Sequence, residues 1–416
     1  MPDSVTRFFG TAPMAQAVTT ATIAALLFSH AIRSVLDWPG YIGVLGGLVV
    51  VSAAVLIARH PEFEWYGILP VSLLLFVAWC AISIAWSGYQ WATLAAVLFQ
   101  VAIGFLGVAV ALSRDLIQIV RAFGDVFRVF FAVSLILEVL SGILLDLPFR
   151  FLGIEGRLAD GGPIQGVAGS RNLLGILALF AAITFAVEYA TRSVRRPVAA
   201  WSLGVVLVVL LLTRSPVSLG IAVLAGLVAL ALVGIRRTPP ERRRPVQLLA
   251  LLVALVTLVT AYLLRTRILE LAGAAGEVDV RVALWRSVGT LARLHPLEGF
   301  GWVGSWRSDL APFYAIVTLN GRTPTTALNA FVDVWFQVGI IGLALFSLLL
   351  GLALVRAWIV ASNRRNVAHL WPALVLVVLA LTAVAESATL VEYGWFLLVI
   401  GAVKAAQELS WRRGLR

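Results

Sequence analysis

The sequence predicts an all-α, polytopic integral membrane protein with about twelve transmembrane helices and one large extracytoplasmic loop that contains short helices. Three observations predict this fold: the composition, the length of the apolar segments, and the alternation of arginines between them. Of the 416 residues, 61% are hydrophobic and only 13% are charged, whereas soluble domains carry roughly 25% charged residues. The mean hydropathy is +0.98. Such an apolar excess is too large for one core and must face lipid.

The apolar segments have the length that a membrane crossing requires, which is about twenty residues. They lie near residues 14–36, 40–58, 67–87, 90–112, 122–145, 171–191, 198–213, 217–235, 247–265, 338–360, 370–388 and 393–410. They divide the chain into residues 1–265 with transmembrane helices 1–9, an extracytoplasmic loop domain over 266–328, and residues 329–416 with transmembrane helices 10–12 and a cytoplasmic C-terminus. The first apolar segment is full length and has no small-residue cleavage site, so we expect no cleavable signal peptide.

Arginines alternate between the connecting segments. The net charge of +11 would suggest nucleic acid binding in a soluble protein. In a membrane protein the basic residues set the orientation of the helices, so we expect no nucleic acid partner. Arginines such as Arg59, Arg114 and Arg236 lie in every second connection, whereas the short connections 37–39 and 87–89 have none. This positive-inside pattern predicts that both termini are cytoplasmic.

Two segments on the predicted outer side break this pattern. The first, near 146–170, contains Arg150 and Arg157, and it is too short to cross regardless of charge. The second segment, 266–328, contains Arg267, Arg281, Arg286, Arg293, Arg307 and Arg322, with Arg265 at its edge. Since a guanidinium can donate two parallel hydrogen bonds to phosphate, these arginines suggest an anionic ligand outside. The alternative is that they snorkel or pair with lipid head groups.

Residues 279–294 of the large loop have apolar side chains at helical spacing. Arg286 and Arg293 would share one face of this helix, and Arg281 would be offset from Arg286 by roughly 140°. Such a helix can lie on the membrane surface with its apolar side down.

Three acidic residues are candidates for a buried functional carboxylate. Glu386 and Glu392 stand at the outer ends of two apolar segments, where an acid must face a cavity or an arginine. For both, a structural ion pair is the alternative to a catalytic base. Asp333 lies in an apolar stretch, where a raised pKa would suit proton abstraction from a sugar hydroxyl. A structural arginine partner is the alternative for Asp333.

Several common sites are missing from the sequence. Cys80 is the only cysteine and lies in an apolar stretch, which excludes a disulfide framework and a cysteine-ligated metal site. The four histidines are scattered, so we predict no metal site. No phosphate-binding loop, zinc-protease motif or nucleophile elbow is present. Energy coupling by ATP within this chain is therefore not expected.

Four stretches together resemble the O-antigen ligase family, which includes polymerases of bactoprenol-linked oligosaccharides. They are Gly-Arg-Leu at 156–158 with Ser-Arg-Asn-Leu-Leu-Gly at 170–175, the Ser-Arg-type turn at 212–218, Arg281 with Trp285 and the glycine-rich stretch 295–301, and Asn-Ala-Phe-Val-Asp at 329–333 with Gly-Ile-Ile-Gly at 339–342. The stretch 281–301 is the most specific, with an arginine, a tryptophan and then Pro-Leu-x-Gly-x-Gly.

The resemblance implies a membrane glycosyltransferase with a GT-C-like helical fold in the bacterial cytoplasmic membrane, acting in cell-envelope polysaccharide biosynthesis. Its donor would be a glycan on a polyprenyl pyrophosphate such as undecaprenyl pyrophosphate, and its acceptor a sugar hydroxyl on a lipid or glycan. No metal or other cofactor would be needed, and other polysaccharide-assembly proteins are candidate partners. The residues expected to bind substrate are Arg157, Arg171, Arg214, Arg281, Arg286, Arg293 and Asn329.

Two departures from the family pattern affect the predicted site. The family usually has a histidine immediately before the asparagine that matches Asn329, and here that position is Leu328. In the 212–218 turn, Pro216 stands at the usual arginine position. The catalytic base is therefore open, and the candidates are two acids and one histidine: Asp333, Glu392 and His295. His295 could instead orient the turn at Pro296.

Two other functions are consistent with the sequence. The chain could transport or export a lipid-linked glycan, or it could be a non-catalytic membrane subunit of a polysaccharide assembly machine. A transporter needs a charged path through the membrane, and only Glu138 and Asp333 stand out within or beside the apolar segments, which disfavours it. The arginine-rich loop disfavours a purely structural subunit.

Overall fold

The structure is a computed structural model that describes residues 7–60, 69–271, 273, 275–316 and 323–408. Arg322, the last arginine of the predicted outer cluster, lies outside the described residues. So do residues 67–68 and 409–410 at the edges of two predicted spans. Within the described residues the secondary structure is helical, and the only β pairing is an isolated bridge between Phe149 and Ile154.

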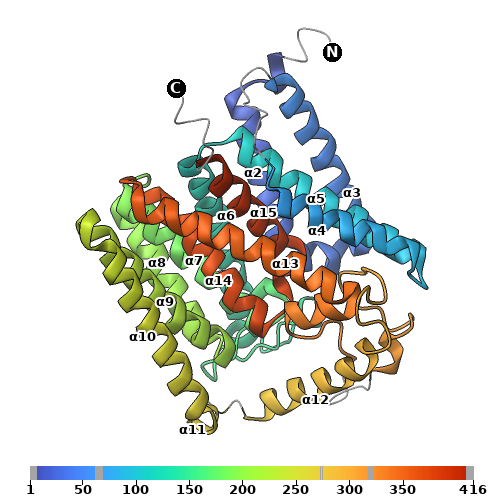
Figure 1. Ribbon diagram of the computed structural model, residues 1–416. Helices are drawn as coiled ribbons and strands as arrows, with labels where there is room; N and C mark the ends of the chain where they lie inside the picture. The colour runs from blue at the N-terminus through green and yellow to red at the C-terminus, as the bar shows by residue number, and fades with distance from the viewer. Residues whose placement is uncertain (1–6, 61–68, 272, 274, 317–322, 409–416) are drawn as a thin grey trace.

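The helices follow one another along the chain with short connections (Figure 1). They are α2 (Ala12–Leu27), α3 (Ser29–Ala58), α4 (Val71–Ile82), α5 (Gln90–Ser113), α6 (Leu116–Val139), α7 (Arg171–Thr191), α8 (Arg196–Leu212), α9 (Pro216–Arg237), α10 (Arg243–Leu263), α11 (Arg265–Leu271), α12 (Ala275–Ala292), α13 (Ala330–Asn363), α14 (Leu370–Ala385) and α15 (Glu392–Glu408).

Helices occur at each of the predicted apolar segments, and α7 has the predicted bounds 171–191. Among the described residues, seven helices are long and apolar enough to cross a membrane. The prediction of an all-α, polytopic membrane protein is thus confirmed. The number of twelve crossings and the side of each connection stay predictions.

Two long helices are interrupted by residues with non-helical backbone. Asp37 (φ 56°) breaks α3, and Ala15 and Val18 of α2 pack against Val55 beyond the break. The chain therefore reverses at Asp37, where the sequence predicts a connection between two spans. Gly339 (φ 69°) and Val338 break α13 into a short first segment and a long second one. A Cβ on Gly339 would lie 2.0 Å from the Leu297 carbonyl oxygen, so only glycine permits this close approach.

The core lies around α7, α14 and α15. Residues 393–403 of α15 are all buried, and α15 packs against α5, α13 and α14. By contrast α10 lies at the periphery, where its leucines, such as Leu248 and Leu251, are exposed. Exposed apolar side chains on a peripheral helix are what a lipid-facing surface requires.

The connections collect at two opposite ends of the helix bundle. In Figure 1 both chain termini lie at one end, and α12 runs across the other. We call these the termini end and the loop end. The loop end receives the starts of α7, α9 and α13 and the end of α14, and it contains the residues that the sequence singles out for chemistry.

Candidate functional site

Arg281 is the centre of a buried polar group at the loop end. It lies on the face of α12 that packs against the bundle, and the residue is only 8% exposed. Its guanidinium donates hydrogen bonds to the carbonyl oxygens of Leu328 (3.1 Å) and Ala385. It also pairs with the Glu386 carboxylate, with Nη2 3.0 Å from Oε1. Arg281 therefore joins three segments that are far apart in sequence.

Glu386 extends this group to two further helices. It follows the last residue of α14 in extended backbone, and its Oε1 also accepts a hydrogen bond from Asn172 Nδ2 (2.8 Å) at the start of α7. Asn172 Oδ1 in turn accepts from the Ser215 hydroxyl (2.7 Å), which caps α9. We call Arg281, Glu386, Asn172 and Ser215 the arginine network. Burial raises the pKa of Glu386, and its bonds to Arg281 and Asn172 oppose that shift.

Asn329 and Asp333 lie beside the arginine network. The Asn329 side chain caps α13, since its Oδ1 accepts from the backbone N–H groups of Phe331 (2.9 Å) and Val332 (3.1 Å). Asp333 is fully buried, and its Oδ2 accepts from the Ala327 N–H (3.0 Å) and from the Ser387 hydroxyl. These bonds hold the backbone that precedes α13, including Leu328, in place.

Gln337 continues the polar contacts into the glycine-rich stretch. It donates to Asp333 Oδ1 (3.4 Å) and to the Gly304 carbonyl (3.0 Å), and its Oε1 accepts from two backbone N–H groups. Gly299 has φ 70°, and a Cβ there would lie 2.5 Å from the Gln337 carbonyl oxygen. The Pro-Leu-x-Gly-x-Gly stretch is therefore a close-packed support for the break in α13.

Two further arginines are brought to the loop end by the network itself. Arg171 directly precedes Asn172 and pairs with Glu277 in the first turn of α12. Arg214 directly precedes Ser215, has φ 44°, and donates to the Asp160 carbonyl (3.2 Å). The Arg214 side chain has no carboxylate partner among the described residues, and it is exposed. Arg171, Arg214 and Arg281 therefore belong to one region.

The other predicted arginines lie away from the network. Arg157 is 55% exposed and pairs with Glu155 at 2.9 Å. Arg286 is exposed on α12, on a face other than that of buried Arg281, as the predicted angular offset requires. Arg293 is exposed directly after the end of α12. They do not contact the arginine network.

The two remaining candidate bases are engaged elsewhere. His295 lies after the end of α12 and pairs with Glu298 at 3.0 Å, away from the arginine network. This bond lowers the pKa of Glu298. Glu392 accepts from the Ser29 hydroxyl at Oε2 (2.8 Å) and from Arg33 at Oε1, so it joins α15 to α3.

Comparison with known families supports the resemblance. Residues 201–347 match the model of a family described as O-Antigen ligase. This part of the chain is similar to the O-antigen ligase family. A search of curated proteins finds no match. The matched region includes Arg214, Arg281 and the Asn329–Asp333 stretch, so three segments of the loop end lie within it.

Two members of the arginine network lie outside the matched region: the sequence did not predict Asn172 as a site residue, and it left Glu386 as either a functional carboxylate or a structural ion-pair partner. Asn172 lies before the matched region and Glu386 after it. The sequence offered partial signals: Asn172 falls in a stretch that resembles the family, and Glu386 is an acid at the end of an apolar segment. Their contact joins residues 214 positions apart, which spacing alone does not reveal.

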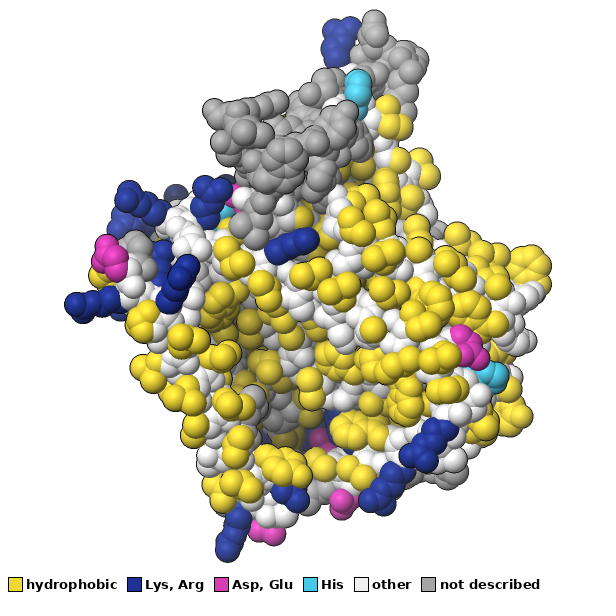
Figure 2. All heavy atoms as spheres, in the orientation of Figure 1, with side chains coloured by type: hydrophobic (Ala, Val, Ile, Leu, Met, Phe, Trp, Pro, Cys, Tyr) yellow, Lys and Arg dark blue, Asp and Glu magenta, His cyan; other side chains and the backbone are white. Residues whose placement is uncertain are grey.

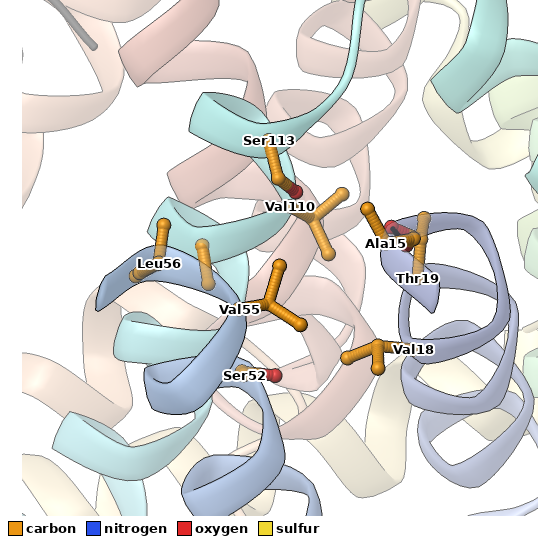
Figure 3. Close-up of a pocket in the computed structure, with 9 residues that line it drawn as sticks. Ala15, Val18, Thr19, Ser52, Val55, Leu56, Val110 and Ser113 are labelled. Carbon is orange, nitrogen blue, oxygen red and sulfur yellow. Dashed lines mark hydrogen bonds between the residues drawn. The ribbon is translucent and has the colours of Figure 1, made fainter. Parts of the chain in front are cut away.

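The surface of the molecule is hollowed near the loop end (Figure 2). Figure 2 shows a recess bordered by hydrophobic side chains, with acidic and basic side chains in its depth and more basic ones along its lower rim. Two enclosed or surface cavities lie elsewhere. An apolar gap of about 10 Å³ separates α2, α3 and α5 (Figure 3), and it is too small for a sugar. Another cavity, of about 600 Å³, lies at the turn Arg192–Pro197 and contains no network residue.

Proposed function

We propose that this chain is a membrane glycosyltransferase of the ligase or polymerase type. It transfers a glycan from a polyprenyl pyrophosphate carrier to a sugar hydroxyl at the loop end. The observation that carries this proposal is the arginine network, which connects Arg281 to the helix starts that bear Arg171 and Arg214. The match to the O-antigen ligase family supports the same reaction class.

The chemistry needs positive charge where a pyrophosphate departs. The acceptor oxygen forms a bond to the anomeric carbon, the bond from that carbon to the pyrophosphate oxygen breaks, and the electron pair leaves with the pyrophosphate. Guanidinium groups stabilise this charge through charge-assisted, bidentate hydrogen bonds, without a metal. Arg214 has no carboxylate partner among the described residues, and Arg171 is 38% exposed, so both can turn to a ligand.

The proposed location is the outer face of the bacterial cytoplasmic membrane, with twelve crossings and both termini in the cytoplasm. Basic side chains at the termini end support it, because there they bond to helix-end carbonyl groups. Arg59 donates to the Ser113 carbonyl (3.1 Å) and Arg236 to the Arg365 carbonyl (2.9 Å). Arginines at this end fit the positive-inside rule.

The proposed substrate-binding residues differ in the support that they receive. Arg171, Arg214 and Arg281 are favoured by the network, and Asn329 supports it by capping α13. Arg157, Arg286 and Arg293 are proposed as outer contacts with the glycan or the acceptor. The contacts of Asp333, His295 and Glu392 favour structural roles for these three proposed bases.

Purified protein in lipid nanodiscs, with a lipid-linked oligosaccharide and an acceptor glycan, tests the proposal through the release of polyprenyl pyrophosphate. Arg281→Ala should lower release by about 10²–10³-fold, the usual cost of removing one such donor. Arg195→Ala changes an exposed arginine at the termini end and should leave release unchanged. Unchanged release in Arg281→Ala would contradict the site, and translocation of the donor without release would contradict glycosyl transfer.

A further inference from the structure

The proposed transfer requires a base, and Leu328 occupies the position where the family usually has histidine. The Leu328 side chain cannot accept a proton, and its carbonyl oxygen is bonded to Arg281. The acids at the loop end therefore need to be compared by one criterion. A general base must offer a carboxylate oxygen that is held in position, is not already bonded, and can be reached.

Glu386 meets this criterion. Its Oε1 accepts both of its hydrogen bonds, from Arg281 Nη2 (3.0 Å) and Asn172 Nδ2 (2.8 Å). Among the described residues, no group donates to its Oε2. The side chain is 10% exposed, so it is largely removed from water without being sealed off. One oxygen is thus anchored and the other is free.

Three other acids at the loop end fail it in different ways, and Glu138, whose Oε1 likewise accepts both of its hydrogen bonds, is only 1% exposed. Asp333 is fully buried and uses both oxygens to hold backbone and Gln337. Glu392 also uses both oxygens, for Ser29 and Arg33. Glu277 has one bonded oxygen, but its side chain is 33% exposed, so it stays solvated as an ordinary surface carboxylate.

We propose that Glu386 is the general base of the transfer and accepts the proton of the acceptor hydroxyl on Oε2. This inference rests on the proposed function. The acceptor oxygen attacks the anomeric carbon as its proton passes to Oε2, and polyprenyl pyrophosphate leaves with the electron pair of the broken bond. The proton then passes from Glu386 to solvent, which restores the carboxylate.

The surroundings of Glu386 suit this role. Desolvation raises the pKa of the carboxyl and so strengthens it as a base, while Arg281 keeps it oriented. Arg281 has five N–H donors, and its three bonds to Leu328, Ala385 and Glu386 leave donors for the leaving group. The same guanidinium can therefore position the base and contact the pyrophosphate.

Glu386→Gln is the first test, because the amide keeps the size of the side chain and an oxygen that can accept from Arg281. We expect donor binding to be retained and release of polyprenyl pyrophosphate to fall by about 10²–10⁴-fold, the usual contribution of a general base. Glu188→Gln is the matched control: Glu188 is also a buried partner of an arginine, Arg128, but it lies outside the loop end. It should release at the wild-type rate.

Azide separates a base from a residue that only maintains structure, since azide attacks the anomeric carbon without losing a proton. In Glu386→Ala, azide should restore release at least tenfold and yield a glycosyl azide, whereas Arg281→Ala should not respond. Wild-type release in Glu386→Gln, or absence of glycosyl azide with Glu386→Ala that still binds donor, would overturn the assignment. Failure of the wild-type protein to release polyprenyl pyrophosphate would instead refute the proposed function.

Discussion

Two arginine–glutamate pairs with buried glutamates lie near opposite ends of α7. Near its start, Asn172 bonds to the Arg281–Glu386 pair; near its end, Glu188 pairs with Arg128 of α6. Arg128 also donates to the Ser202 hydroxyl (3.0 Å), so this second pair joins α6, α7 and α8.

The two pairs differ in access to the free carboxylate oxygen. The Glu188 side chain is 0% exposed, and its Oε1 is buried with no hydrogen-bond partner. A Cβ on Gly124 would lie only 2.3 Å from that oxygen, which shows how closely α6 covers it. The Glu386 side chain is 10% exposed and lies at the loop end, where the surface is hollowed (Figure 2). An arginine–glutamate pair therefore stabilises the fold where its free carboxylate oxygen is enclosed, as in Arg128–Glu188. It can take part in catalysis where that oxygen is accessible, as in Arg281–Glu386.

Arg128→Ala should give the largest effect and confine it to stability. Because it leaves the Glu188 charge buried without a partner, we expect the free energy of unfolding to fall by about 3–5 kcal/mol. Release per folded molecule should not change. Thermal unfolding in detergent, together with activity normalised to folded protein, checks both parts. A large fall in release per folded molecule would mean that the two pairs are not functionally distinct.

Arg281→Lys should lower the release of polyprenyl pyrophosphate more than it lowers stability. Lysine keeps the charge but lacks the planar fork that bonds to Leu328, Ala385 and Glu386 together. We expect release to fall about 100-fold, which corresponds to about 2.7 kcal/mol in the barrier. Steady-state release kinetics measure it, and Arg128→Lys serves as the matched change in the enclosed pair. Equal losses of release in Arg281→Lys and Arg128→Lys would show that the two ion pairs do not differ in function.

Much of the architecture could be predicted because it depends on local patterns. The length of the apolar segments predicted where the helices lie, including the bounds of α7, and helical periodicity predicted that Arg286 lies on a different face from Arg281. The helix was predicted to continue to residue 294, but α12 ends at Ala292, before Arg293. The partners of these side chains could not be predicted in the same way. Glu386 meets Arg281 across 105 positions, and its role depends on which carboxylate oxygen is left free. That property arises only from tertiary packing.

Asp333→Asn should have a smaller effect, mainly on stability. The amide nitrogen of asparagine would replace one of the two carboxylate oxygens. It cannot accept a hydrogen bond, so either the Ala327 N–H or the Gln337 amide group would lose its acceptor. We expect a loss of about 1–3 kcal/mol of stability. Release per folded molecule should fall less than in Glu386→Gln. A greater loss in Asp333→Asn would assign the base to Asp333.

Arg293→Ala should have the smallest effect. The side chain is exposed directly after the end of α12, and no hydrogen bond or ion pair joins it to the arginine network within the described residues. An exposed charge contributes about 0.2–1 kcal/mol, so we expect the KM for the acceptor to rise by no more than about fivefold, with kcat unchanged. Acceptor titration at saturating donor measures it. A tenfold loss in kcat would show that the reacting centre extends along α12.

A structure of the protein with a bound lipid-linked oligosaccharide would test the central claim most directly. We predict that the pyrophosphate lies at the loop end, within hydrogen-bond distance of Arg281 and of Arg214 or Arg171. The first sugar should place its anomeric carbon on the side of Glu386 Oε2. A pyrophosphate bound at the termini end, or one at the loop end without contact to Arg281, would contradict the account.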